Sequence, residues 1–394
     1  LSANMGVWVK NANLSISLSL TALRLVGFWP PEALTDNGKL LYYCYAVFVF
    51  MCLLGTYLII QVVDLFLIWG DLPLMTGTAF LLFTNLAQAA KFVNLLARRK
   101  VIQEIIEEAD GVLTAVESEE AKEIVRSCDR ETTLLQRLYF TFTMITGLGW
   151  ATSAENNQLP LRAWYPYDTS KSPAYELTYC HQVSALLIAA SLNVGKDTLV
   201  TALIAQCRCR LRLLGLALKT LCQDMELKDE GLTAAQESTV NARLRACVTE
   251  HRAALQAAVM LQQSFSEPTF MQFNVSLIII CVTAFQLCAR ERWKWLLSMG
   301  TYLVNMMFQV FIYCYQGNQL SEESSEIAGA VYECPWYLAS VKLRRVLLIV
   351  MVRSRRVARL QAGSFTTLSL ASFMAIIKAS YSLFTLLRQV EEKR

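Results

Sequence analysis

Charged residues and histidines are scarce in this chain. Asp, Glu, Lys and Arg make up 17% of its 394 residues, whereas 55% are hydrophobic, and there are only two histidines. A soluble domain typically contains about 25% charged and about 45–50% apolar residues. The composition therefore excludes an ordinary soluble globular protein and predicts a protein that crosses a membrane several times.

The sequence also lacks the motifs of common enzymes and metalloproteins. It contains no Walker loop, no GxGxxG and no CxxC, and its histidines, His181 and His251, lie too far apart to share a site. The twelve cysteines are scattered, and the spacing of Cys207 and Cys209 on a predicted helix is poor for binding one metal ion. We therefore expect no enzyme activity, no cofactor, no metal site and no nucleic-acid partner.

Seven apolar runs are long enough to cross a membrane, which takes about 20 mainly apolar residues in a helix. The predicted spans are residues 40–63, 72–90, 134–154, 179–205, 266–288, 293–315 and 365–387. An eighth run, residues 346–352, is flanked by arginines and rises only about 10 Å as a helix. It cannot span, and we expect it to be a buried patch on a cytoplasmic helix. The sequence thus predicts an all-α membrane protein with seven transmembrane helices.

Lysines and arginines are concentrated in every second connection between the spans. Residues 91–137 and 207–252 carry eight each and residues 317–361 carry seven, whereas residues 64–71 carry none and 153–180 carry two. Basic loops stay on the cytoplasmic side of a membrane. We therefore expect a cytoplasmic amino terminus and an extracellular carboxyl terminus, the reverse of a G-protein-coupled receptor. The short turn at residues 290–294 carries three bases and departs from this pattern.

The cytoplasmic connections are predicted to be helical. Apolar residues recur at helical spacing in residues 101–116, 204–221 and 244–259. Helices of this kind need apolar partners outside the membrane. The pattern leaves two interpretations open, which are packing within one chain and a cytoplasmic assembly domain between subunits.

Few ionisable side chains lie within the predicted spans. Lys196 and Asp197 lie in the fourth span, and Lys378 and Tyr381 lie in the last. Charges inside a membrane are costly and often functional. As neighbours on one helix, Lys196 and Asp197 point in different directions. We predict that Asp197, Lys378 and Tyr381 line a water-filled path or join a polar network, the alternative being aqueous pockets or side chains that extend to the membrane surface.

The outer halves of spans two, three, four and six combine aromatic, methionine and small residues. Small residues leave space that larger side chains can line, as in a largely apolar pocket for a small organic ligand. Ordinary helix packing uses the same small residues, and composition alone favours that interpretation. The candidate ligand-binding residues are Phe80, Phe83, Met144, Gly147, Trp150, Leu187, Ala190, Tyr302 and Met306.

The carboxyl-terminal third carries a distinctive series of motifs. An aromatic-rich sixth span leads to Gly-Asn, a Ser-rich acidic helix, Tyr-x-Cys-x-Trp, an Ala-Gly turn and a span ending in Lys-x-Ser-Tyr-Ser-x-Phe-Thr. The residues are Gly317, Asn318, Ser321, Ser324, Tyr332, Cys334, Trp336, Ala362, Gly363, Lys378, Ser380, Tyr381, Ser382, Phe384 and Thr385. This series resembles the insect odorant receptor family, and a less specific resemblance covers the whole chain.

The resemblance implies an odorant-gated, non-selective cation channel in the plasma membrane of sensory neurons. It implies a heterotetramer with coreceptor subunits in membrane lipid, a small volatile ligand and no required G protein. The compact connection between spans four and five indicates an odorant-tuning subunit, because the coreceptor has a large insertion there. The last span would line the pore, with Phe384, Thr385, Leu387 and Arg388 near the gate. Arg388 departs from the uncharged or aliphatic residue that the family often has at the constriction.

The expected organisation has four parts. These are a cytoplasmic amino-terminal segment (1–39), six spans with the odorant pocket and cytoplasmic helical extensions (40–315), a cytoplasmic anchor helix (316–361) and a pore-lining last span (362–390). The alternatives are a gustatory receptor-type channel that works without the coreceptor, a G-protein-coupled receptor and a transporter. The predicted topology and the lack of an Asp/Glu-Arg-Tyr or Asn-Pro-x-x-Tyr motif argue against a G-protein-coupled receptor. The lack of an inverted repeat argues against a transporter.

Overall fold

The computed structural model is a helical bundle, and the predicted all-α fold class is confirmed. It describes residues 13–31, 35–69, 72–152, 159, 164–169, 171–223, 225, 232–289 and 293–392. The longer helices are α1 (Leu14–Leu25), α2 (Asp36–Phe48), α3 (Thr56–Leu67), α4 (Leu72–Ala97), α5 (Arg99–Thr114), α6 (Glu119–Thr152), α7 (Ala174–Lys219), α8 (Ala234–Ala289), α9 (Trp293–Glu333), α10 (Val341–Ser354) and α11 (Leu370–Glu392). A π-helix (η2, Val49–Gly55) joins α2 to α3, and a 3₁₀ turn (η3, Trp336–Leu338) follows α9. Two short strands, β1 (Gln361–Ala362) and β2 (Thr366–Thr367), pair antiparallel before α11.

Five helical segments among the described residues are long and apolar enough to cross a membrane. They are Asp36–Leu67, Ala174–Lys219, Ala234–Cys288, Leu296–Glu333 and Leu370–Gln389. These segments contain the predicted spans one, four and five and most of the sixth and seventh. The second predicted span lies on α4, and the third lies on α6 as far as Thr152.

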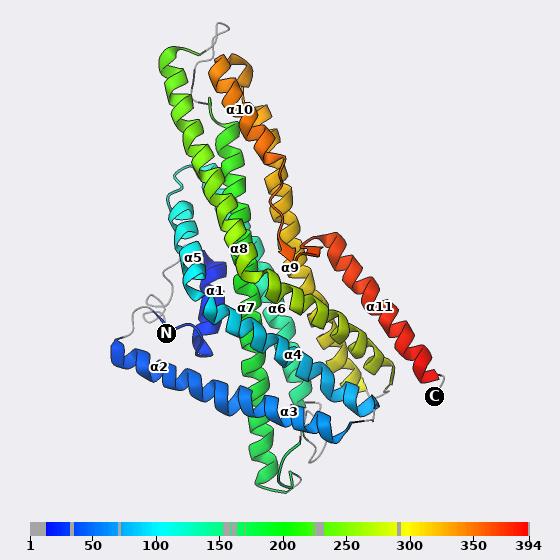
Figure 1. The fold of residues 1–394 in the computed structure, drawn as a ribbon. Helices are drawn as coiled ribbons and strands as arrows, with labels where there is room; N and C mark the ends of the chain where they lie inside the picture. Colours follow the sequence, from blue (N-terminus) through cyan, green and yellow to red (C-terminus); the bar gives the residue numbers. More distant parts are fainter. Residues whose placement is uncertain are drawn as a thin grey trace.

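Helix α7 is the central element of the bundle. It packs against α1, α6, α8 and α9, and Figure 1 shows it running through the middle of the bundle for much of the length of the molecule. Its 46 residues are about 69 Å long at about 1.5 Å per residue, far more than one membrane crossing needs. Beyond the predicted fourth span, Leu211, Leu214 and Leu218 are buried, so the predicted amphipathic extension is confirmed.

The amino-terminal segment contains a helix that the sequence analysis did not predict. Ile16, Leu20 and Leu23 of α1 are buried and belong to the main hydrophobic core, packed against α7. The side chain of Leu23 fits closely over Gly195, where an added Cβ would lie 3.2 Å from it. The Asp129 carboxylate of α6 accepts hydrogen bonds from the first backbone amides of α1, at 3.1 Å and 3.0 Å. Helix α1 is thus fastened to the bundle at both ends.

Residues 316–361, the expected anchor segment, are divided among the end of α9, η3, α10 and β1. Helix α9 continues without a break from the sixth predicted span to Glu333, and Pro335 then enforces a new segment because the residue before a proline avoids helical geometry. The patch at residues 346–352 is also only half buried. Leu347 and Val350 face α9, whereas Leu348 and Ile349 are 59% and 67% exposed. The physical reason is amphipathicity, since the chain itself covers only one face of α10.

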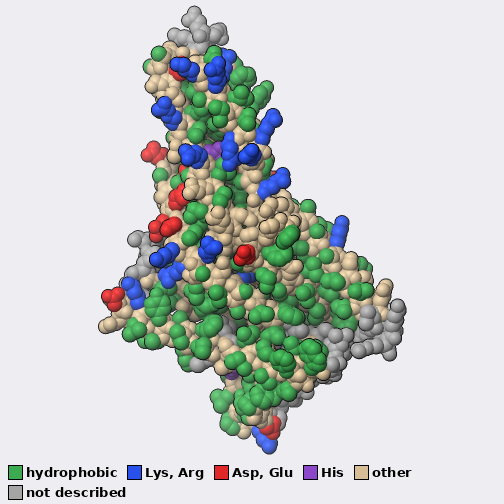
Figure 2. Space-filling view, viewed as in Figure 1, with side chains coloured by type: hydrophobic (Ala, Val, Ile, Leu, Met, Phe, Trp, Pro, Cys, Tyr) green, Lys and Arg blue, Asp and Glu red, His purple; other side chains and the backbone are tan. Residues whose placement is uncertain are grey.

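The two ends of the molecule differ in surface chemistry. Figure 2 shows lysines and arginines gathered toward the end that carries α10, while hydrophobic side chains cover much of the opposite part. Helix α11 stands to one side in Figure 1 and contacts α8 and α9. Most of its surface, including Met374, Tyr381 and Leu386, is exposed.

Candidate functional site

An apolar cluster lies between α3, α6, α7, α8 and α9. The largest rings and thioethers within it come from helices that are far apart in the sequence. Its buried members are Tyr57, Trp150, Ala185, Ile279, Ile280, Met299, Tyr302 and Met306. Ile377 of α11 packs against the cluster from the side. The arrangement offers an apolar surface with aromatic faces, the chemistry that holds small organic molecules in proteins.

Three of the predicted ligand-binding residues meet in this cluster. Trp150 of α6 and Tyr302 of α9 have ring centroids 5.0 Å apart, within the range of favourable aromatic pairs, and Met306 follows one turn after Tyr302. The Tyr302 hydroxyl is 2.8 Å from the Thr84 hydroxyl of α4. This contact fixes the position of one polar group in the cluster.

The other predicted ligand-binding residues lie around the cluster or away from it. Gly147 faces α7, where an added Cβ would lie 3.5 Å from Leu187. Leu187, Ala190 and Met144 are half-buried. Phe83 is 38% exposed on α4 and is not among the buried residues of the cluster. The side chain of Phe80 lies outside the described residues.

Asp197 is the centre of a buried polar network. Its carboxylate accepts from the Lys91 ammonium at 2.6 Å and from the Tyr313 and Tyr139 hydroxyls at 2.8 Å and 3.2 Å. The Gln309 side-chain amide donates to it as well. Asp197 is fully buried and Lys91 is 7% exposed, so the pair is shielded from water. Four polar side chains from α4, α6 and α9 thus meet at the Asp197 carboxylate.

The network ties together the helices that carry it. Asn193 of α7 donates to the Tyr139 hydroxyl at 3.3 Å, and Gln272 of α8 donates to Gln309 of α9 at 2.8 Å. A buried ion pair adds stability only when further hydrogen bonds satisfy its remaining atoms, and here four donors surround one carboxylate. We expect the network to fix the relative positions of α4, α6, α7, α8 and α9.

A pocket lies beside this network, next to Pro268, which lies inside the continuous helix α8. The proline removes one backbone donor and leaves the Ser264 carbonyl without its helical partner. The Asn94 side-chain amide replaces that donor at 2.8 Å. The pocket is lined by Lys91, Asn94, Leu95, Lys196, Asp197, Val200, Phe265, Pro268, Thr269 and Tyr313.

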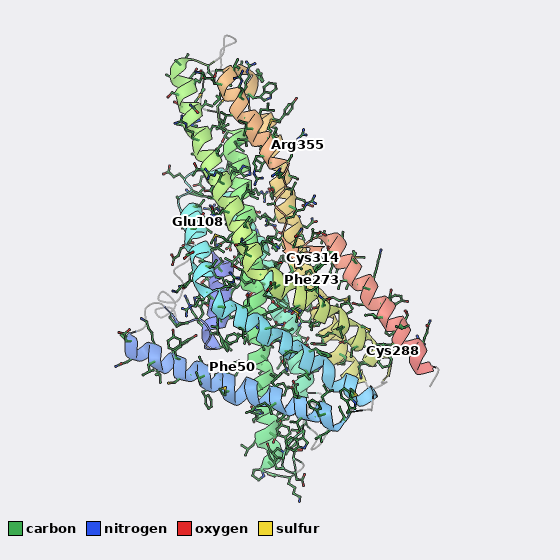
Figure 3. All side chains as sticks on the ribbon, in the orientation of Figure 1. Phe50, Glu108, Phe273, Cys288, Cys314 and Arg355 are labelled. Carbon is green, nitrogen blue, oxygen red and sulfur yellow. The ribbon has the colours of Figure 1, made fainter. Side chains whose placement is uncertain are left out.

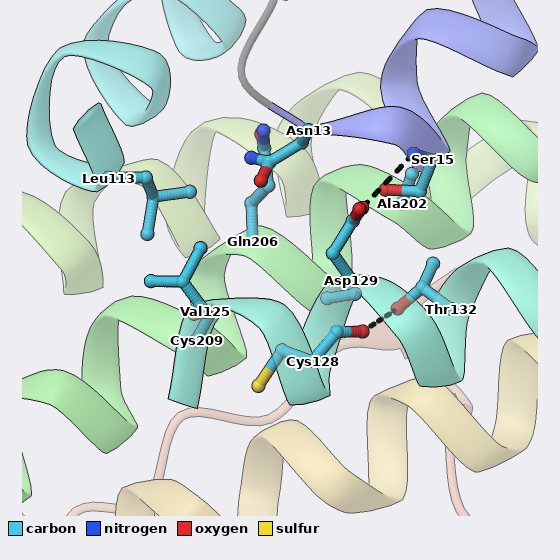
Figure 4. A pocket seen from close by; sticks show the side chains of 11 residues that line it. Asn13, Ser15, Leu113, Val125, Cys128, Asp129, Thr132, Ala202, Gln206 and Cys209 are labelled. Atoms are coloured by element: carbon cyan, nitrogen blue, oxygen red, sulfur yellow. Dashed lines mark hydrogen bonds between the residues drawn. The ribbon is translucent and has the colours of Figure 1, made fainter. Parts of the chain in front are cut away.

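A second pocket lies between α1, α6 and α7 (Figure 4). Most of the residues that line it lie outside the predicted spans three and four. The Cys128 and Cys209 thiols meet at its edge. The Cys209 thiol, which hydrogen-bonds to Cys128, and the Arg208 guanidinium lower the pKa of Cys128. The pocket is small, and Asp129 at its rim is already used to cap α1.

Several basic residues outside the predicted spans form ion pairs with glutamates and are not simply exposed to solvent. The buried Arg208 binds Glu131 through two nitrogens, at 3.1 Å and 2.8 Å. Arg210, also buried, bridges Glu250 of α8 at 2.7 Å and Glu108 of α5 at 3.0 Å. Figure 3 shows Glu108 on α5 at the flank of the bundle. These pairs fasten the helical extensions to one another within one chain, which supports the first of the two interpretations of the amphipathic connections.

The predicted pore residues lie on α11. Phe384, Thr385 and Leu387 are half-buried in the single chain, and Arg388 is exposed. The expected intramembrane residues Lys378 and Tyr381 are exposed on the same helix.

Helix α11 is held by few contacts. The Ser380 hydroxyl donates to the Leu277 carbonyl of α8 at 3.1 Å. Near its start, Phe373 stacks edge-on against Phe311 of α9. Figure 3 shows Phe273 on α8 and Cys314 on α9 at this level. The few contacts leave one side of α11 free to meet lipid or other chains.

Sequence reasoning missed the partners of Asp197. Lys91 was counted among the bases of a cytoplasmic connection, yet it is buried against Asp197. Tyr139, Tyr313 and Gln309 look like ordinary residues of their spans. The only available signal was the position of Lys91 directly after an apolar run, without a turn-forming residue between them.

Comparisons with known proteins are consistent across family, sequence and structure. A family model described as 7tm Odorant receptor matches residues 71–381. Odorant receptor Or1 of Anopheles gambiae is 24% identical over 401 residues, covering 96% of each chain. Odorant receptor 82a of Drosophila melanogaster is 24% identical over 341 residues, covering 82% of this chain and 86% of that one.

The fold also matches a solved structure. The insect olfactory receptor OR5 from Machilis hrabei, solved alone and in complex with eugenol, aligns with a TM-score of 0.80. The sequences are 17% identical, and the alignment covers 95% of this chain and 97% of the other. The seven-transmembrane architecture is therefore shared.

Proposed function

The chain belongs to the 7tm odorant receptor family, and we propose that it is an odorant-tuning subunit that opens a non-selective cation channel together with coreceptor subunits. Insect odorant receptors are ligand-gated cation channels rather than enzymes, and this chain is a multi-pass membrane protein of that family. The observation that carries the proposal is the apolar cluster around Trp150 and Tyr302, which Ile377 connects to α11. The site of action is the plasma membrane of sensory neurons.

The ligand is a small volatile organic molecule that binds at the apolar cluster. Trp150 and Met306 supply apolar and polarisable surface, and the Tyr302–Thr84 hydroxyl pair supplies one point for a hydrogen bond. The complex of the Machilis hrabei receptor with eugenol supports this class of ligand. Phe80, Phe83, Met144, Gly147, Leu187 and Ala190 complete the proposed binding region at its edges.

Gating follows from differential affinity. A ligand can shift the channel toward its open state only by binding that state more tightly than the closed one. Ile377 packs against the cluster, so a ligand that moves the aromatic side chains also moves the packing surface of α11. We assign the pore to the face of α11 that carries Phe384, Thr385, Leu387 and Arg388. Widening of this constriction lets water and cations enter.

The proposed assembly is a heterotetramer with a cytoplasmic amino terminus and an extracellular carboxyl terminus. The alternating basic connections support this orientation. The exposed apolar residues of α10 lie at the basic end of the molecule, where lipid tails cannot cover them. They support subunit contacts in a cytoplasmic anchor domain.

The test is whole-cell current during a panel of volatiles, with G-protein signalling blocked. The chain is expressed alone and with an insect coreceptor. We expect fast cation currents only in the co-expressing cells. Trp150→Ala and Tyr302→Ala should each raise the odorant concentration for half-maximal current at least about tenfold, because truncating a central aromatic contact typically costs more than about 1.4 kcal/mol.

The matched control is Leu148→Ala, which truncates an apolar side chain that is 60% exposed on α6, the helix that carries Trp150. It should leave the half-maximal odorant concentration unchanged, whatever its effect on maximal current. Surface labelling must show equal expression of all variants. Unaltered potency in both aromatic variants would place the ligand elsewhere, and currents from the chain alone would support a gustatory receptor-type channel.

A further inference from the structure

The polar network contains more positive than negative charge. Lys91, Lys196 and Asp197 are 7%, 3% and 0% exposed, and all three line the pocket beside Pro268. With both lysines protonated, this buried group carries a net charge of +1. An uncompensated charge in a site of low dielectric constant is costly. The surplus positive charge of this group therefore requires a physical explanation.

Each oxygen of the Asp197 carboxylate already accepts two hydrogen bonds. Lys91 and Tyr313 donate to one of its oxygens, and Tyr139 and Gln309 donate to the other. Lys196 is the next residue on α7 but points in a different direction, as adjacent residues on a helix must. Asp197 therefore neutralises Lys91 and is not available to Lys196.

The Lys196 ammonium has one hydrogen-bond partner in the described part of the chain. It donates to the Gln88 carbonyl of α4 at 2.9 Å, and no described carboxylate lies within 4.0 Å of it. An ammonium has three donor hydrogens. When Lys196 is protonated, two hydrogens and a positive charge thus remain beside a pocket that also holds the polar side chains of Thr269 and Tyr313.

We propose that this pocket binds one compact anionic group, which accepts hydrogen bonds from Lys196 and neutralises the surplus charge. The group is either a free monatomic anion of chloride size or an oxygen of an anionic lipid headgroup. Its place is between α4, α7 and α8, next to Pro268 of α8. The inference rests on these contacts alone and does not depend on which odorant opens the channel.

The consequence is a link between anion binding and the stability of the bundle. The anion would join the helices that Asp197 already connects, because Lys196 of α7 also holds the Gln88 carbonyl of α4. A ligand that binds the folded state alone stabilises it by RT ln(1 + [L]/Kd), where [L] is its free concentration. Anion occupancy should therefore be measurable as a rise in melting temperature.

The experiment uses the full-length chain with a fluorescent protein at its amino terminus, in phosphatidylcholine nanodiscs with gluconate as the only small anion. Melting is followed by fluorescence-detected size-exclusion chromatography after heating. One arm replaces gluconate with chloride at constant ionic strength, and the other adds phosphatidic acid without chloride. We expect the melting midpoint to rise by about 2–4 °C in one arm, and the responding arm identifies the source of the anion.

Lys196→Met should abolish the rise, and Lys100→Met, which removes an exposed lysine of α5, should retain it. If Lys196→Met does not fold, Lys196→Gln is used instead, because glutamine keeps a hydrogen-bond donor but carries no charge. A wild-type chain that responds in neither arm would overturn the proposal and leave Lys196 as a neutral amine. A rise that persists without the Lys196 charge would overturn it too, because the anion would then bind elsewhere.

Discussion

His251 shows how the burial of one side chain sets a pH dependence. It lies on α8, outside the predicted spans, and is buried. Burial, together with the positive charge of Arg353, lowers the pKa of His251 below its usual value. The folded chain therefore holds this imidazole neutral at a pH where an exposed histidine, with a pKa of about 6.5, takes up a proton. The unfolded state binds that proton more readily, so the free energy of unfolding falls as the pH drops below about 6.5.

We predict that His251→Gln loses less thermal stability than the wild type when the pH is lowered from 7.5 to 5.0. The measurement is the melting midpoint of the detergent-solubilised chain at the two pH values. His181→Gln is the matched control, because it removes the only other histidine and leaves His251 in place. An equal loss of stability in the wild type and in His251→Gln would show that other groups cause the acid sensitivity.

The sequence allowed Asp197 to be predicted as a site residue, but not the residues that contact it. Asp197 was identifiable because a carboxylate inside an apolar run is unusual. Its partners were not, because Lys91, Tyr139 and Tyr313 are separated by dozens of residues and meet only through the packing of α4, α6, α7 and α9. Trp150, Tyr302 and Met306 were predicted from their residue types and do meet. Phe83 has the same chemistry but faces outward, since nothing in the local pattern fixed the rotation of α4.

At the scale of elements, the junction between α9 and α11 depends on Gly317. A Cβ at this position would lie 2.7 Å from the Leu368 carbonyl oxygen and even closer to the Leu368 side chain. Leu368 follows β2 directly and leads into α11. We predict that Gly317→Ala destabilises the chain by about 1–3 kcal/mol, because the backbone before α11 must move away from α9. The check is a lower melting temperature and a changed maximal odorant current.

Gly329→Ala is the matched control on the same helix. An added Cβ at Gly329 meets no atom within 4 Å, so the substitution removes only the conformational freedom of glycine. It should be neutral or stabilise α9 by up to about 1 kcal/mol. If Gly317→Ala behaves like Gly329→Ala, the contact between α9 and the β2–α11 connection does not restrain the last helix.

Periodicity predicted the elements well where one face of a helix is buried within the chain. The helical spacing of Ile102, Ile105 and Ile106 correctly predicted α5, which packs its apolar face on α7. Helix α1 was missed, because its short amphipathic pattern is interrupted by buried serines such as Ser15 and Ser19. The Ser19 hydroxyl is satisfied inside the bundle because it hydrogen-bonds to the Ser15 carbonyl and to Thr198, and such pairing cannot be read from a pattern.

At the scale of the whole molecule, the basic end and the apolar face of α10 must be considered together. The alternation of basic connections predicts which end lies in the cytoplasm, and the long helices α7, α8 and α9 carry the chain far beyond the membrane. With that end in the cytoplasm, as the basic connections predict, the exposed apolar face of α10 would meet neither lipid nor the rest of the chain. In the proposed heterotetramer, this face is covered by neighbouring subunits.

We predict that Ile349→Asp in α10 lowers co-purification of the tagged chain with its coreceptor at least about tenfold, because an unpaired charge at the centre of an apolar contact is costly. Ile349 is 67% exposed in the single chain, so the substitution should leave the fold of the chain intact. Val259→Asp is the matched control, since it places the same charge at an exposed apolar position of α8 outside the predicted spans. Unchanged co-purification of Ile349→Asp would exclude α10 from the assembly contact. A selective loss, with normal membrane insertion, would establish that the tetramer depends on a helix face that the isolated chain leaves uncovered.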